Sequence, residues 1–248
     1  MPLWVSEAAQ GFWSRAGFAS AAPHDLRRAV LWALPIDVVE IPQLSVGRVR
    51  EWLSAQGVQD DVVDARVRDR LLRACVVARS ACGLLMIDQG DAESEQRFSL
   101  AHELAHFLRH YIHRRDQAVK QLGPGILQVL DGFRPPTTEE RVHAVLARFR
   151  LGAHVHLMER TATGHSTSVI SHAEREADLL AFELLAPSAE ILDAVSGVRA
   201  VHQRSRITEL LTTRWGLPEG PATDYASMLT PERPEGLWDE RLRALQRS

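Results

Sequence analysis

Apolar residues recur along the chain at two spacings, which indicate where it forms strands and where it forms helices. Short β-branched or apolar runs between turn residues predict strands at 37–42, 74–79, 83–88, 153–158 and 167–170. Helical spacing covers 25–34, 45–56, about 91–113, 126–130, 139–149, 171–187, 188–196 and about 206–215. The sequence therefore predicts an α+β fold that is mainly helical, with a small antiparallel sheet of about three to five short strands.

Two of the predicted helices, at about 91–113 and at 171–187, have a continuous apolar face. The residues of these faces are Phe98, Ala101, Ala105, Leu108 and Ile112 on the first, and Ala177, Leu180, Ala181, Leu184 and Leu185 on the second. Such faces are expected to be buried. These two helices therefore form the predicted core, and the residues that carry chemistry lie on them.

Composition and charge place the chain among ordinary globular proteins. Its 248 residues are 45% hydrophobic and 25% charged, with a formal net charge of −3. No block of Lys or Arg stands out, so direct nucleic-acid binding is not expected. The sequence begins with no signal peptide and contains no run of about 18 apolar residues, which predicts a cytoplasmic protein that does not enter a membrane. Cys75 and Cys82 are too few for a disulfide framework and are expected to be reduced.

The first long helix contains His102-Glu103-Leu-Ala-His106, the pattern HExxH. Residues four apart lie nearly above one another on a helix, so the two imidazoles can share one Zn²⁺. Glu103 lies beside them, close enough to take a proton from metal-bound water. The metzincin continuation HExxHxxGxxH is excluded, because Arg109 and Ile112 occupy its glycine and histidine positions.

A catalytic zinc site needs three protein ligands and an open position for water, so one ligand remains to be found. His110 is a poor candidate, since three histidines along one straight helix spread too far for a tetrahedral site. On the second long helix, Glu174 can reach the metal while Asp178 hydrogen-bonds a ligand histidine and fixes its orientation. Ser171-His-Ala-Glu174 also fits a capping box, in which Glu174 only caps its own helix. The pattern by itself leaves both interpretations open.

The two helices together resemble the ImmA/IrrE family of zinc metallopeptidases. The resemblance rests on Arg97-Phe-Ser-Leu-Ala-His-Glu-Leu-Ala-His-Phe-Leu, preceded by the predicted hairpin and followed by Glu174-Arg-Glu-Ala-Asp-Leu-Leu-Ala-Phe-Glu-Leu-Leu-Ala-Pro187. It covers about 35–190 and implies a zincin-like core of the gluzincin type. The sequence departs from the family in two places. The segment 117–170 is longer than usual and is expected to be an insertion, and the phenylalanine of the second motif is shifted, to Phe182.

Carried over by position, the resemblance implies that His102 and His106 bind Zn²⁺ and that Glu103 is the general base. Glu174 is expected to be the third ligand, with Glu176 as the alternative. The implied reaction is hydrolysis of a peptide bond by zinc-bound water. A second hydrogen-bond donor for the oxyanion is usual in such sites. Its candidates are Tyr111, His165 and His172.

Members of the family typically cleave a transcriptional repressor. The resemblance therefore implies a cytoplasmic zinc metalloendopeptidase whose substrate is a separate helix-turn-helix repressor, with roles in stress response and transcription regulation. The alternative is a non-catalytic zinc-binding module that regulates a transcription factor by binding it. The peptidase domain is expected at 1–200. A C-terminal helical extension follows at 201–248, and about the last twelve residues are expected to be disordered.

Overall fold

A computed structural model of the chain describes residues 1–17, 22–58, 62–146, 153–160 and 168–230. Four strands form one sheet in the order β1-β3-β2-β4. They are β1 (Ile36–Ile41), β2 (Leu72–Arg79), β3 (Cys82–Asp88) and β4 (His154–Glu159). The α+β class and the expected number of strands are confirmed.

The sheet is mixed rather than purely antiparallel. β2 and β3 form the predicted hairpin, in which Arg79 pairs with Cys82, and β4 runs antiparallel to β2. β1 runs parallel to β3, with Ile36 opposite Gly83. The expected antiparallel pairing is wrong for β1, because the chain crosses over through a helix and β2 before it returns as β3. Strand patterns in the sequence do not record such a crossover.

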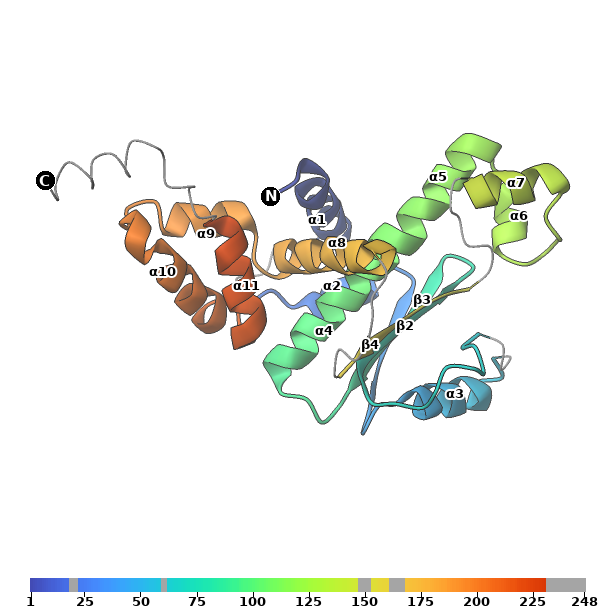
Figure 1. Ribbon diagram of the computed structural model, residues 1–248, viewed down its shortest axis with the longest axis horizontal. Helices are drawn as coiled ribbons and strands as arrows, with labels where there is room; N and C mark the ends of the chain where they lie inside the picture. Colours follow the sequence, from blue (N-terminus) through green and yellow to red (C-terminus); the bar gives the residue numbers. More distant parts are fainter. Residues whose placement is uncertain (18–21, 59–61, 147–152, 161–167, 231–248) are drawn as a thin grey trace, which may run out of the picture.

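The helices cover most of the described chain. They are α1 (Leu3–Ala16), α2 (Leu26–Ala33), α3 (Val46–Ala55), α4 (Glu93–His106), α5 (His113–Leu122), α6 (Ile126–Leu130), α7 (Thr138–Leu146), α8 (Ser168–Leu185), α9 (Ser188–Ala194), α10 (Ala200–Thr213) and α11 (Glu219–Leu229). Between α4 and α5 the chain continues as a short π-helix, η1 (Phe107–Ile112). Figure 1 shows α4, η1 and α5 as one long rod across the molecule.

Several elements differ from the predictions. The helix expected to end at about 113 continues as α5 to Leu122. The strand expected at 167–170 is wrong, because α8 begins at Ser168. α1 and α11 were not predicted, since Gly11 interrupts the first pattern and a glycine and a proline stand in the first turn of the second. Thr167, the end of the helix predicted at 139–149 and the tail after 230 lie outside the described residues.

Apolar layers lie on both faces of the sheet. The larger layer packs α1, α2, α4 and α8 against the face that includes Val76, and the smaller layer packs α3 against the face that includes Val77 (Figure 1). Adjacent residues of a strand point to opposite faces, so β2 contributes to both layers. α4 is thus enclosed between the sheet and α8.

The C-terminal helices pack onto the end of α8 and extend the larger layer. Trp215 and Tyr225 are fully buried in it, and the Tyr225 ring stacks on Phe182 of α8 with centroids 4.6 Å apart. The boundary expected at residue 200 stays a prediction. Cys75 is buried and Cys82 exposed, and both are free thiols. Within the described ranges, no helix combines the length and apolar character that a membrane crossing requires.

Candidate metal centre

The HExxH residues lie on the most enclosed part of α4. Every residue from Phe98 to His106 is buried, which is unusual for a helix and follows from its place between the sheet and α8. His102 and His106 face α8 and present their Nε2 atoms to one point, 3.1 Å apart. A buried pair of convergent imidazoles supplies two ligand atoms, and further ligands are needed to complete a metal site.

α8 supplies two acidic groups that face the histidine pair. Oε2 of Glu174 lies 3.3 Å from Nε2 of His102, and Oε1 lies 3.7 Å from Nε2 of His106. Oδ1 of Asp178 lies 3.0 Å from Nδ1 of His102. Ser171 lies inside α8, so it is not the residue that caps the helix, and the capping-box interpretation of Glu174 does not apply.

A third histidine, His156 of β4, joins the cluster. Its Nε2 lies 3.0 Å from Oε1 of Glu174, and its Nδ1 lies 2.9 and 3.0 Å from the two carboxylate oxygens of Glu103. Its ring stacks on that of His106 with centroids 3.6 Å apart. The sequence analysis missed this residue. His156 alternates with Val155 and Leu157, which face the smaller layer, so the sequence indicates that His156 faces the opposite side of the sheet. This side can be identified as the side of α4 only once β4 is known to pair with β2.

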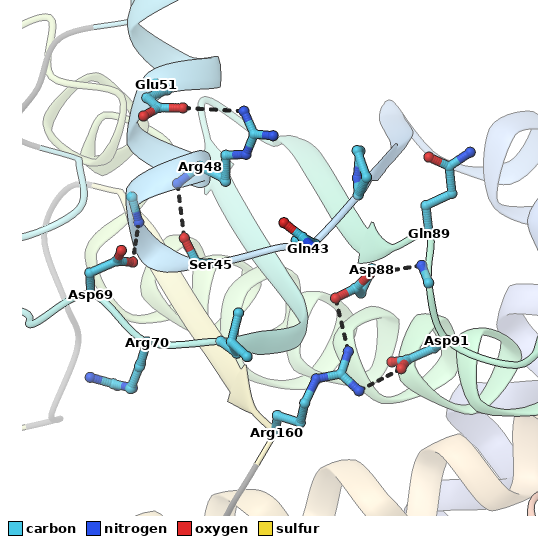
Figure 2. A pocket seen from close by; sticks show the side chains of 14 residues that line it. Gln43, Ser45, Arg48, Glu51, Asp69, Arg70, Asp88, Gln89, Asp91 and Arg160 are labelled. Atoms are coloured by element: carbon cyan, nitrogen blue, oxygen red, sulfur yellow. Dashed lines mark hydrogen bonds and ion pairs between the residues drawn. The ribbon is translucent and has the colours of Figure 1, made fainter.

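Arg160 holds the far end of β4 in place. Its guanidinium donates to Oδ2 of Asp88 at 2.8 Å and to Oδ1 of Asp91 at 2.6 Å, which joins β4 to the loop between β3 and α4 (Figure 2). These residues line a pocket of about 1080 Å³ at this edge of the sheet. Other charged groups of the pocket are also paired: Arg48 with Glu51, Arg70 with Glu159, and Asp69 with the N–H of Gly47. These ion pairs and hydrogen bonds therefore hold β4, which carries His156, close to the start of α4.

The side chains of the cluster fit a zinc-sized cation. His102, His106, His156 and Glu174 each offer one ligand atom, and these atoms all lie within 4.8 Å of one another. In a tetrahedral site with bonds of about 2.0–2.1 Å, neighbouring ligand atoms are about 3.3 Å apart. The separations among His102, His106 and Glu174, which are 3.1, 3.3 and 3.7 Å, bracket that value.

Carboxylates and imidazoles in the cluster shift one another's pKa. Burial disfavours a charged His102, but hydrogen bonds to the two carboxylates of α8 outweigh it and raise the pKa to about 9. Burial also opposes charge on His156, yet Glu103 and Glu174 raise its pKa to about 10. Burial would raise the pKa of Glu174, but three imidazoles hold it below its usual range. Burial keeps the pKa of His106 well below its usual value. The cluster thus balances its charges, as a group of buried ionisable side chains must.

Glu176, the alternative third ligand, is directed toward η1. Its carboxylate accepts hydrogen bonds from Nε and Nη2 of Arg109, at 3.0 and 2.6 Å, and its Oε2 lies 3.3 Å from Nε2 of His110. The cluster is therefore completed by Glu174, two residues earlier on α8.

The oxyanion candidates lie in other places. The hydroxyl of Tyr111 accepts the N–H of Ala81 in the hairpin turn at 2.8 Å. The imidazole of His172 is 73% exposed, with its Nε2 3.9 Å from Glu176. His165 lies outside the described residues. His156, by contrast, lies within hydrogen-bonding distance of the Glu103 carboxylate.

A family model matches the part of the chain that contains the HExxH helix. Residues 75–144 match the IrrE N-terminal-like domain of the peptidase M78 family, from β2 into α7. The matched stretch ends before His156 and Glu174. No curated protein and no solved structure matches the chain. The match confirms the resemblance on which the sequence analysis relied, and it agrees with the histidine–glutamate cluster that the fold assembles. Residues 75–144 are therefore similar to the IrrE N-terminal-like domain of the peptidase M78 family, and the chain carries a histidine–glutamate cluster of the kind that a metallopeptidase uses.

Proposed function

We propose that the chain is a zinc-dependent endopeptidase in which Glu103 is the general base. The observation that carries this proposal is the position of the Glu103 carboxylate. The Glu103 side chain is fully buried, and Glu103 follows His102 directly on α4. The imidazole ring of His156 lies between the carboxylates of Glu103 and Glu174. A carboxylate in such a place has the reach and the water-poor surroundings that proton transfer in a peptidase needs.

Each residue of the proposed site has a distinct task. A bound zinc ion would lower the pKa of a water molecule toward neutrality and polarise a peptide carbonyl. His102, His106 and Glu174 would hold it. The Asp178 carboxylate can only accept, so it keeps a proton on Nδ1 of His102 and directs the Nε2 lone pair into the cluster.

Glu103 would take a proton from the attacking water and pass it to the leaving amine. Nδ1 of His156 lies within hydrogen-bonding distance of both Glu103 oxygens and holds the carboxylate in one orientation. Because the imidazole is 18% exposed, the same N–H group can also reach a substrate that enters beside it.

One observation favours the alternative, a zinc-binding module that regulates a transcription factor without cleaving it. His156 offers a fourth protein ligand atom, and structural zinc sites have four protein ligands whereas catalytic sites keep one position open. X-ray absorption of the zinc-loaded chain separates the two. Two imidazoles with additional oxygen ligands support the peptidase, and three imidazoles with one carboxylate support the closed module.

The proposed substrate is a separate helix-turn-helix repressor in the cytoplasm, and the proposed roles are in stress response and transcription regulation. Support for this part comes from the ImmA/IrrE resemblance alone. A buried catalytic group also favours a narrow substrate range, because a substrate must fit between β4 and α8 to reach it.

The decisive experiment is the variant Glu103→Gln, with Glu139→Gln on the exposed side of α7 as the matched control. Glutamine keeps the shape of the side chain and cannot accept the proton. We expect unchanged zinc content and a loss of cleavage of about 10²–10⁴-fold for a repressor produced together with the chain, followed by mass spectrometry. If Glu103→Gln still relieves repression while it binds zinc, the endopeptidase proposal fails and the binding module replaces it.

A further inference from the structure

His110 lies close to His106 but on the side away from the other cluster residues. α4 passes into η1 without a break, and the first turn of η1 brings Nδ1 of His110 to 3.0 Å from Nδ1 of His106. The ring centroids are 5.0 Å apart. Both side chains are largely buried, with 3% and 12% of their surface exposed. His110 therefore contacts the nitrogen of His106 that does not face Glu174.

The far side of His110 is fixed by Glu176. Oε2 of Glu176 lies 3.3 Å from Nε2 of His110, while its Oε1 accepts two hydrogen bonds from Arg109. The guanidinium of Arg109 also lies over the ring of Trp4 in α1, 4.2 Å from the centroid. Arg109, itself packed on Trp4, thus holds Oε1 of Glu176, and Oε2 is directed toward His110.

The positions of these groups determine which nitrogen carries each proton. An ionised carboxylate only accepts, so the proton of a neutral His110 lies on Nε2 and its Nδ1 is an acceptor. Nδ1 of His106 must then be the donor in the contact between the two rings. A neutral imidazole carries one N–H, so Nε2 of His106 is left with a free lone pair, directed at His102 and Glu174.

We propose that His110 and Glu176 are positioning residues that hold His106 in the tautomer required for metal binding. The inference rests on the proposed function, because it assigns these residues a task in the same metal site. The two ligand histidines are then oriented in different ways. Asp178 acts on His102 directly, whereas Glu176 acts on His106 through the ring of His110.

The test compares two substitutions of His110. His110→Leu removes the acceptor, and His110→Asn keeps a short polar side chain whose amide oxygen can take the place of Nδ1. His113→Leu is the matched control, since His113 is an exposed histidine three residues further along the same rod. We expect His110→Leu to weaken zinc binding about 10–100-fold, measured by competition with a chelator, and His110→Asn and His113→Leu to stay within a few-fold of the parent chain.

A second readout reports the tautomer itself and does not depend on metal loading. Long-range ¹H–¹⁵N NMR of the chelated parent chain should show His106 protonated at Nδ1, and this signature should be lost in His110→Leu and kept in His110→Asn. A proton on Nε2 of His106 in the parent chain overturns the proposal, and so does unchanged zinc affinity in His110→Leu. If the parent chain binds no zinc, the proposed function fails, while the NMR result still decides for or against the role of His110.

Discussion

Oδ1 of Asp178 lies 3.0 Å from Nδ1 of His102, across the contact between α8 and α4. The contact joins two segments that are far apart in the chain, and it fixes the orientation of the His102 imidazole within the cluster. Such outer partners commonly matter to metal affinity nearly as much as the ligands do.

Asp178→Ala is therefore expected to weaken zinc binding about 10–100-fold, because the His102 ring can then rotate and place its proton on Nε2. Asp178→Asn keeps an acceptor oxygen and should lie between the parent chain and the alanine variant. Chelator competition gives both affinities. Asp193→Ala, at an exposed acid on α9, is the control, and an equal effect there would contradict a specific role for Asp178.

Zinc is expected to stabilise the folded chain. The proposed ligand atoms come from α4 and α8, and an unfolded chain does not bring these segments together. At free zinc about a thousand times the dissociation constant, the free energy of unfolding should rise by about 4 kcal/mol. Thermal unfolding with and without a chelator measures the change. A similar rise in the double variant His102→Ala/His106→Ala would mean that zinc binds elsewhere.

Glu103 and His156 are expected to be energetically coupled in the zinc-free chain. The Glu103 side chain is fully buried, and both of its oxygens lie within hydrogen-bonding distance of Nδ1 of His156. His156→Ala leaves that carboxylate without this partner and should cost about 1–3 kcal/mol. Urea unfolding of the parent chain, His156→Ala, Glu103→Gln and the double variant should give a coupling of about 0.5–3 kcal/mol. Additive effects would show that the contact contributes little to stability.

Gly216 is expected to resist substitution because its backbone lies in the left-handed region that disfavours a Cβ. Its φ is +64°, and a Cβ at this position would collide with Nη1 of Arg97, which donates to the carbonyl of Trp215 at 3.0 Å. Gly216→Ala should lower the free energy of unfolding by about 2 kcal/mol or more. Gly220→Ala, in open space on α11, should be neutral or stabilising by up to about 1 kcal/mol. Urea unfolding compares them, and equal effects would exclude a cost of the left-handed backbone at Gly216.

The part of the site that follows from helical periodicity was accessible from the sequence. HExxH places His102, Glu103 and His106 whatever surrounds the helix, since only the helical repeat is needed. The choice between Glu174 and Glu176 was not accessible in this way. The two differ by about 200° around α8, and the packing of the apolar face determines which of them is directed at α4.

Other features depended on contacts between segments far apart in the chain. His156 could not be assigned before the edge position of β4 was known, because nothing near it in sequence distinguishes it from His154. The parallel pairing of β1 depends on a crossover that strand patterns do not encode. α11 was missed because a proline in its first turn suggested a break, although proline is well tolerated there.

The π-helix η1 makes the number of residues between 107 and 112 more important than their identity. A π-helical turn holds one residue more than an α-helical turn, so everything after it is rotated by about 100° relative to an uninterrupted α-helix. Inserting one further residue into 107–112 should therefore rotate α5 and separate Arg115 from Asp131, which now form two hydrogen bonds of 2.7 Å. Hydrogen exchange should then show loss of protection in α6 and α7, whereas a substitution of Leu108 by another large apolar residue should not. In this segment a single-codon insertion is expected to be more damaging than most substitutions.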